Sequence, residues 1–370
     1  MKIAIISTRG IPNNYGGFEQ FAEHLSVGLV VRGHEVLVYS PHFHPYKENS
    51  YKGVKIKHIY SPEPWLGSSI GSFFYDFNSL RDALKKEKID IIYEAGYTSI
   101  VPAFIWFNIK SIKSPVVVTN MDGLEYRRSK FNSWARKFIF WEERQAVKHS
   151  HHLIADNLGI RDYYKEKYGK DARYFAYGAN IAPHYNSAHL REFHLSENNY
   201  YLVIARLEPE NNIEMIIEGY LQSRQSPPLI IIGKTNTAYG KWLQKKYAGN
   251  ALIRFLGGIY DADKINALRR FSVAYFHGHS VGGTNPSLLE AMAAGCFVIA
   301  HDNPFNKAVL DTDALYFNSS DSIAQTLNHP VPDGAKAQFI ENNLEKIRRN
   351  YSWEQLIEAY EAYFLSVLSE

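Results

Sequence analysis

The most informative residues for chemistry form a glycine-rich turn that leads into a helix start. The apolar run Val273–Phe276 predicts a strand, and the polar turn after it ends in an apolar helical pattern. Asn285 is a favoured N-cap, Pro286 suits the first helical position, and Gly282-Gly283-Thr284 lets a ligand approach the backbone closely. A helix start presents free N–H groups and a partial positive charge, so phosphate is the natural ligand.

Two further side chains could hold a nucleotide. Glu290 lies just over one turn into that helix, where it can accept hydrogen bonds from ribose hydroxyls; the alternative is a solvated glutamate on an ordinary capped helix. Arg206 follows the apolar run Tyr201–Ala205, and its planar guanidinium suits a diphosphate. The alternative for Arg206 is a surface ion pair with Glu208 or Glu210.

Alternating apolar runs and helical patterns predict the elements that position these residues. Such alternation is typical of parallel strands covered by crossover helices, whose ligands bind at the carboxyl ends of the strands. The loop-like segment 180–199 divides the pattern into an expected first domain, 1–184, and a second, 196–350, and a last helix is expected over 353–370. The expected strands are Ile3–Ser7, Val36–Tyr39, Lys55–Ile59, Asp90–Glu94, Val116–Thr119, His152–Ala155, Tyr174–Ala176, Tyr201–Ala205, Leu229–Ile232, Ile253–Leu256, Ala274–Phe276, Phe297–Ile299 and Leu315–Phe317.

Composition excludes several classes of protein. A chain of 370 residues with a net charge of +3 lacks the dense basic runs of nucleic-acid-binding proteins, so no nucleic acid partner is expected. The single cysteine, Cys296, excludes an internal disulfide framework. The apolar start before Arg9 is too short for a signal peptide, and no stretch reaches the ~18 apolar residues of a membrane span. A cytoplasmic location is expected, with peripheral contact at the inner face of the cell membrane left open.

These stretches, together with the amino-terminal segment Ser7–Glu19, resemble the retaining GT-B glycosyltransferases of family four. Within that family they are most similar to bacterial rhamnosyltransferases of surface polysaccharide synthesis. The resemblance implies an α/β fold in which two Rossmann-like parallel-sheet domains face a cleft and the last helix crosses back to the first domain.

The resemblance also implies roles for individual residues. Arg206 matches the diphosphate-binding arginine and Glu290 the ribose-binding glutamate, while Gly16 and Gly17 match a glycine loop beside the diphosphate. Gly283, Thr284 and Asn285 match the loop that faces the donor sugar and phosphates. The catalytic candidates are Arg206, Gly17 and Asp122, the last falling where many relatives carry a sugar-contacting histidine.

Two positions depart from the family pattern. The usual lysine five residues after the diphosphate arginine is Asn211, for which Lys234 is a candidate substitute; a solvated surface lysine is the alternative. A second glutamate is usual eight residues before Glu290, where this chain has Gly282. Losing that acceptor for sugar hydroxyls fits a deoxysugar donor.

The function expected from the resemblance is retaining transfer of a sugar from a nucleoside diphosphate to a saccharide or lipid-linked saccharide. L-Rhamnose from a thymidine-diphosphate donor is one candidate, and no metal or other cofactor is expected. Two alternatives stay open: a sugar-nucleotide epimerase of the same fold, which would consume donor without acceptor, and a silent subunit that binds the nucleotide sugar.

Two other motifs each allow a structural and a functional interpretation. Asp261-Ala-Asp263 resembles a metal-binding motif, but it precedes a helical pattern and is expected to cap it. In the basic, aromatic stretch 126–141, the side chains Trp134, Phe138 and Trp141 share a helical face. This stripe is expected to face the core, and a membrane-facing surface is the alternative.

Overall fold

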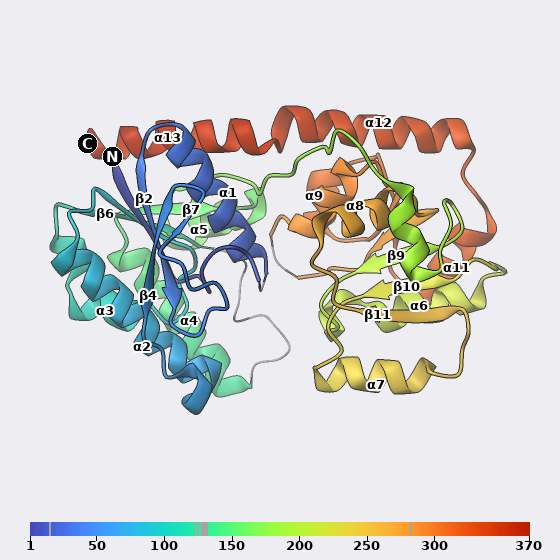
Figure 1. The fold of residues 1–370 in the computed structure, drawn as a ribbon, viewed down its shortest axis with the longest axis horizontal. Helices are drawn as coiled ribbons and strands as arrows, with labels where there is room; N and C mark the ends of the chain where they lie inside the picture. Colours follow the sequence, from blue (N-terminus) through green and yellow to red (C-terminus); the bar gives the residue numbers. More distant parts are fainter. Residues whose placement is uncertain (15, 122, 124–125, 127–131, 282) are drawn as a thin grey trace. The chain divides into compact units, whose positions relative to one another are not determined.

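The computed structural model describes residues 1–14, 16–121, 123, 126, 132–281 and 283–370. The chain divides into two compact units, each considered by itself. Unit 1 consists of Met1–Tyr177 and Trp353–Glu370, and unit 2 of Gly178–Ser352 (Figure 1). Asp122 and Gly282, both singled out in the sequence, lie outside the described residues.

Unit 1 contains an eight-stranded sheet in the order β3-β4-β2-β1-β5-β6-β7-β8. Every neighbouring pair is parallel except the short β3–β4 hairpin. The apolar runs bury both faces, as the central strand β1 shows with no exposure from Ile3 to Ile6. The strands are β1 (Lys2–Ile6), β2 (Glu35–Pro41), β3 (Ser50–Tyr51), β4 (Val54–Ile59), β5 (Ile91–Glu94), β6 (Val116–Asn120), β7 (His152–Ala155) and β8 (Ala172–Tyr174).

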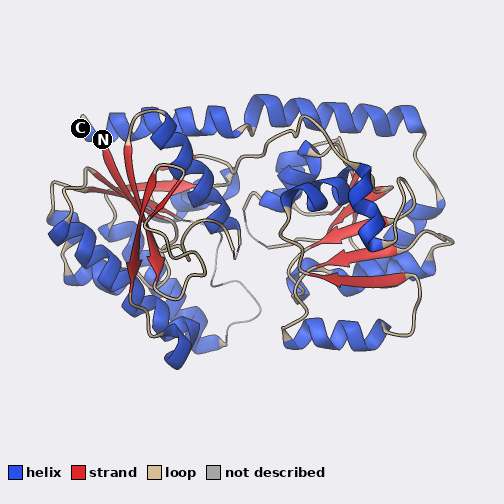
Figure 2. Ribbon diagram, viewed as in Figure 1, coloured by secondary structure: helices blue, strands red, loops and turns tan. Residues whose placement is uncertain are grey.

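Helices cover both faces of this sheet (Figure 2). The last helix packs beside α1, where Tyr360 lies with its ring centroid 5.5 Å from that of Phe21 and 5.8 Å from that of Tyr93. The carboxyl-terminal helix therefore packs as part of the first unit. The helices are α1 (Gly17–Val31), α2 (Glu63–Lys86), α3 (Val101–Trp106), η1 (Ile109–Ser111), α4 (Ser133–His149), α5 (Leu158–Tyr168) and α13 (Trp353–Leu368).

Unit 2 contains a six-stranded, wholly parallel sheet in the order β11-β10-β9-β12-β13-β14. Its strands are β9 (Tyr201–Ile204), β10 (Leu229–Ile232), β11 (Ile253–Gly257), β12 (Ala274–His277), β13 (Val298–His301) and β14 (Leu315–Phe317). The helices around them are η3 (Ser187–Phe193), η4 (Pro209–Asn211), α6 (Ile213–Gln222), α7 (Ala238–Tyr247), α8 (Ala262–Arg270), α9 (Pro286–Ala293), α10 (Pro304–Leu310), α11 (Ser320–Asn328) and α12 (Asp333–Asn350).

The α/β architecture predicted from the sequence is confirmed. Each strand expected from an apolar run is present, with ends that differ by at most two residues. The two-residue strand β3 carries no apolar run and was not predicted. Across the described ranges, no helix combines the length and apolar character that crossing a membrane requires.

Candidate functional site

Three neighbouring strands of unit 2 bring polar side chains to one edge of the sheet. Strands β9, β12 and β13 are adjacent and parallel, so their carboxyl ends meet there. Strand β12 ends at His277 and β13 at His301, while Arg206 lies two residues beyond β9. Arg206 is exposed, and no described carboxylate forms an ion pair with it. The pairing with Glu208 or Glu210 considered above is therefore not seen among the described residues.

Asn211, the position at which the resemblance leads one to expect a lysine, holds the backbone beside Arg206. Its side chain is buried, and Nδ2 donates a hydrogen bond of 2.7 Å to the carbonyl oxygen of Arg206. Because that carbonyl can only accept, Oδ1 is the atom that lies 2.7 Å from Nδ1 of His279. Nδ1 must therefore carry the proton, so in the neutral imidazole Nε2 is the nitrogen that can accept a hydrogen bond. Asn211 thus links the backbone of the arginine to a histidine and adds no charge.

The loop after β12 is held by side-chain amides. Asn212 Nδ2 donates to the carbonyl of Gly278 at 2.8 Å, and Asn303 and Asn306 both donate to the carbonyl of His279 at 3.0 Å. A Cβ on Gly278 would lie 2.0 Å from the carbonyl oxygen of Asn211, so only glycine allows this approach. These bonds fix the backbone that presents His279.

His277 lies beneath this loop and is buried. Burial lowers the pKa of His277 well below its usual value, and the neighbouring imidazoles of His279 and His301 lower it further. His277 is therefore neutral at physiological pH. Any cationic imidazole at this edge must come from the more exposed histidines.

The helix start predicted from the sequence is confirmed. Asn285 caps α9 by accepting a hydrogen bond of 2.9 Å from the backbone N–H of Ser287, and Pro286 occupies the first turn. Thr284 is buried, and Gly283 is half-buried. The donor-binding roles of Gly283, Thr284 and Asn285 stay predictions.

Glu290 forms an ion pair with Arg269, whose side chain is only 4% exposed. The guanidinium of Arg269 also donates to the side chain of Asn266 at 3.3 Å. The glutamate is thus neither solvated nor an uncompensated negative charge next to an expected phosphate. This pairing could not be predicted from the sequence, because Arg269 and Glu290 lie on different helices, α8 and α9.

Lys234 and Asp261 contact residues close to them in the structure. Lys234 is exposed, and its Nζ lies 5.0 Å from the ring centroid of Tyr260. Asp261 accepts hydrogen bonds from the backbone N–H groups of Asp263 and Lys264 at 3.0 and 3.1 Å, which confirms the predicted cap. The described residues contain no group of three or more acidic, histidine or cysteine side chains that could hold a metal ion.

The predicted glycine loop of unit 1 precedes α1. Gly16 is the N-cap residue, with extended backbone and no side-chain cap, and Gly17 begins the helix. Glu19, in the first turn, is buried and accepts a hydrogen bond of 2.8 Å from the backbone N–H of Arg9. Burial raises the pKa of Glu19. Glu19 therefore ties the segment after β1 to the start of α1.

Unit 1 also contains a buried carboxyl cluster that sequence reasoning missed. Ser99 donates its hydroxyl to Asp76 at 2.5 Å and its backbone N–H to Glu142 at 2.9 Å. Burial raises the pKa of Asp76 to about 7 and that of Glu142 to about 8. Burial also raises the pKa of Glu94, the last residue of β5, whose pKa the charge of Asp76 raises further. Glu94, an acidic residue at the end of an apolar run, was the sequence feature that could have indicated this cluster.

The expectation that Trp134, Phe138 and Trp141 face the core is wrong. Their exposed fractions are 80%, 42% and 38%. The buried face of α4 is formed instead by Ile139, Glu142, Glu143, Ala146 and Val147. The helix turns two carboxylates inward to partners in unit 1, and this leaves its aromatic side chains at the surface.

Sequence families match both parts of the chain. Residues 188–346 match the family described as glycosyl transferases group 1. Residues 1–180 match the family described as a domain of unknown function, DUF1972. The phosphatidyl-myo-inositol mannosyltransferase of Mycolicibacterium smegmatis is 23% identical, over 94% of this chain and 90% of its own length.

Solved structures with the same fold cover the whole chain. Sucrose-phosphate synthase from Thermosynechococcus elongatus superposes with a TM-score of 0.82 at 14% identity, over 100% of this chain and 99% of the other. HepE from Anabaena, solved in complex with UDP and glucose, gives 0.73 at 16% identity, over 99% and 100%. The fold and the group 1 match define a transferase of the GT-B type. The chain is a glycosyltransferase.

Proposed function

We propose that the protein transfers a sugar, with retention of anomeric configuration, from a nucleoside diphosphate bound at the strand ends of unit 2. The observation that carries the proposal is the exposed guanidinium of Arg206, which follows β9 and has no ion-pair partner among the described residues. Its backbone carbonyl is tied through Asn211 to His279. An exposed cation on an ordered strand end suits an anionic ligand such as a diphosphate.

Stabilisation of the leaving diphosphate is the chemistry that these residues can supply. Charge develops on the diphosphate as the bond to the sugar breaks, and fixed donors that need no reorganisation stabilise such charge best. Arg206 offers a guanidinium, and the N-terminus of α9, capped by Asn285, offers backbone N–H groups. In the proposed mechanism the acceptor hydroxyl attacks from the face of the leaving group, and the departing phosphate takes its proton. No step requires a metal ion.

Glu290 is proposed to hold the ribose hydroxyls. Its ion pair with Arg269 supports this role, because a compensated carboxylate can accept hydrogen bonds without repelling the nearby diphosphate. Gly16, Gly17 and Asp122 remain proposed contributors from unit 1, and Lys234 is a proposed contributor from unit 2.

The donor and acceptor are proposed at the level of chemical class. HepE was solved with UDP-glucose, and the mycobacterial relative is named for a mannosyl transfer to phosphatidyl-myo-inositol. These names support a nucleoside-diphosphate sugar as donor and a lipid-containing acceptor. The proposed acceptor is a saccharide or lipid-linked saccharide, in synthesis of bacterial surface polysaccharide at the inner face of the membrane. L-Rhamnose from its thymidine diphosphate is one candidate donor sugar.

Ligand screening followed by transfer assays tests this proposal. Nucleoside-diphosphate sugars, thymidine-diphosphate rhamnose included, are screened by thermal shift, because a ligand that binds the folded state raises its apparent stability. The stabilising donor is then incubated with saccharide acceptors, and NMR assigns the anomer of the product. We expect acceptor-dependent transfer with retention. Donor consumption without acceptor would favour an epimerase, and binding without turnover on any acceptor a silent subunit.

A further inference from the structure

Unit 1 exposes a large apolar surface on helices α2, α3 and α4. On α2 the exposed fraction of Trp65 is 82%, and on α3 that of Trp106 is 75%. Phe73 of α2 lies with its ring centroid 5.9 Å from that of Phe138 on α4, so the two helices share this surface. The exposed apolar side chains of the three helices are Trp65, Leu66, Ile70, Phe74, Ile105, Trp106, Trp134, Phe138 and Trp141. Apolar area of this kind marks a binding surface.

The exposed charged residues of segment 101–150, which includes α3 and α4, are of one sign in the part of it that the structure describes. Between Val101 and Ser150, every exposed charged residue that the structure describes is a lysine or an arginine. The two carboxylates of α4, Glu142 and Glu143, are buried beneath them. The exposed basic residues are Lys110, Lys113, Arg136, Lys137, Arg144 and Lys148. A partner for this surface must therefore be anionic.

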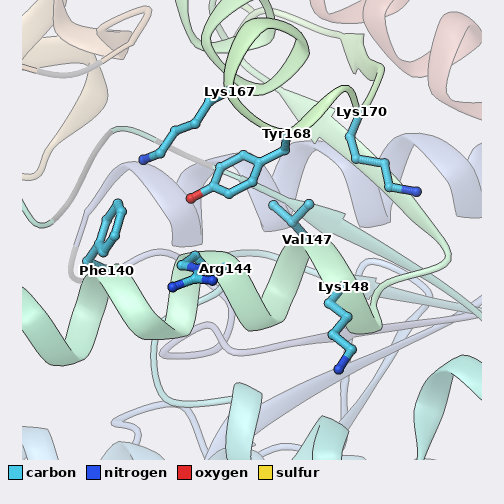
Figure 3. A pocket seen from close by; sticks show the side chains of 7 residues that line it. All are labelled: Phe140, Arg144, Val147, Lys148, Lys167, Tyr168 and Lys170. Atoms are coloured by element: carbon cyan, nitrogen blue, oxygen red, sulfur yellow. The ribbon is translucent and has the colours of Figure 1, made fainter.

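A basic groove lies where α4 meets the end of α5 (Figure 3). It is open, has a volume of about 590 Å³, and is lined by Phe140, Arg144, Val147, Lys148, Lys167, Tyr168 and Lys170. Lys167 is compensated, because it donates to the buried carboxylate of Glu143 at 3.1 Å. Two exposed carboxylates lie next to groove residues along the chain: Asp171, which is paired with Lys165 at 2.6 Å, and Glu166, which precedes Lys167.

Three cations of this groove have no such compensation. Arg144, Lys148 and Lys170 form no ion pair with any residue in the described part of the chain. The field they create reaches nearby groups. Burial and the charge of Lys170 both lower the pKa of Lys110, and burial together with Lys148 and Lys110 lowers that of His149. Complementing the helix dipole accounts for Lys148 in the last turn of α4, but not for Arg144 or Lys170.

The apolar surface and the groove are joined along one stripe of α4. Trp134, Phe138, Trp141, Arg144 and Lys148 follow one another at spacings of three and four residues, and all are exposed. Aromatic and aliphatic side chains beside uncompensated cations match the interface of an anionic bilayer, where rings enter the headgroup layer and cations meet lipid phosphates.

We propose that this face of unit 1 binds anionic phospholipid bilayers, and that the α4–α5 groove receives a lipid headgroup phosphate. The surface uses none of the residues assigned to donor binding. Its test therefore stands apart from the transferase proposal and needs no substrate.

Vesicle flotation tests the proposal. The intact chain is mixed with vesicles of phosphatidylcholine, with or without phosphatidylglycerol. We expect flotation only with the anionic vesicles, and less of it as salt rises. Lys148→Ala/Lys170→Ala should weaken partitioning roughly 30-fold, at about fivefold per cation near the surface. Trp106→Ala/Trp134→Ala should also weaken it and reduce the blue shift of tryptophan fluorescence on binding, since Trp65 and Trp141 remain.

Two matched variants serve as controls. Arg191→Ala/Arg224→Ala removes two exposed charges from unit 2, and Leu365→Ala/Leu368→Ala removes two exposed apolar side chains from α13. Both should float like the parent. Equal flotation with neutral vesicles, or full flotation of the Lys148/Lys170 variant, would overturn the proposal. So would release by inorganic phosphate at constant ionic strength, which would assign the groove to a soluble phosphate.

Discussion

The carboxyl-terminal strand edges of the two sheets carry opposite chemistry. In unit 2 the edge presents the exposed cation Arg206, and side-chain amides bond the loop backbone around His279. In unit 1 the corresponding edge buries Asp76 and Glu94, whose pKa values are raised. A diphosphate would be attracted to the exposed cation of the first edge, whereas the raised pKa values favour the neutral form of the buried carboxyls at the second. Two units with the same fold can therefore differ in their affinity for an anionic donor because the charges at their strand ends differ.

The two edges also differ in how buried charge is compensated. The buried guanidinium of Arg269 is paired with Glu290, whereas neither carboxylate oxygen of Glu94 has a hydrogen-bond partner among the described residues. The stability of unit 2 should depend on keeping both members of the buried pair, whereas that of unit 1 should depend on the pH at which its buried carboxyls titrate. Variants of the two sites should therefore lose stability under different conditions.

The largest effect is expected at the buried pair of unit 2. Glu290→Ala leaves Arg269 buried and uncompensated, which should lower the free energy of unfolding by about 3–5 kcal/mol, measured by urea denaturation. Adding Arg269→Met removes the stranded charge and should restore most of that stability. If Glu290 also holds the ribose, the double variant will be stable and still use donor poorly. A stable double variant with parental donor use would exclude the ribose role.

The carboxyl cluster of unit 1 predicts a stability that falls as pH rises. The pKa of Asp76 is about 7 in the folded chain against 3.8 ordinarily, so the folded state keeps a proton that the unfolded state releases between these values. Stability is therefore greatest below about pH 4 for this group and decreases until about pH 7. Asp76→Asn should reduce that decrease by on the order of 4 kcal/mol in denaturation curves across the window. The exposed Asp162→Asn should leave the parental pH dependence unchanged, and an unchanged Asp76→Asn curve would contradict the assignment.

A smaller effect is expected at the imidazole beside Arg206. If His279 Nε2 contacts the donor diphosphate, His279→Ala removes that hydrogen bond. kcat/KM for the donor should then drop by roughly threefold to tenfold, as for a net hydrogen bond of about 1 kcal/mol. His194→Ala, in the segment before β9, provides a histidine control. A kcat/KM equal to that of the parent would show that His279 does not meet the donor.

Much of the fold could be predicted from the sequence because buried parallel strands and crossover helices leave strong local patterns. The cap of α9 at Asn285 and the cap of α8 at Asp261 were predictable for the same reason, since a cap acts within three residues. The ion pair of Arg269 with Glu290 was not, because it depends on how two helices pack. The exposure of Trp134 was mispredicted because helical periodicity identifies a face but not the direction in which it points. On α4 the buried carboxylates Glu142 and Glu143 determined that direction.

Titration of a nucleoside diphosphate by isothermal calorimetry tests the central claim most directly. Uridine and thymidine diphosphate are titrated into the parent, Arg206→Ala, and the matched surface control Arg224→Ala. Loss of one charge-assisted contact, worth about 1.5–3 kcal/mol, should weaken binding of the diphosphate that the parent prefers by roughly tenfold to 100-fold in Arg206→Ala and leave Arg224→Ala unaffected. Equal affinity in all three proteins would contradict the placement of the diphosphate at the strand ends of unit 2.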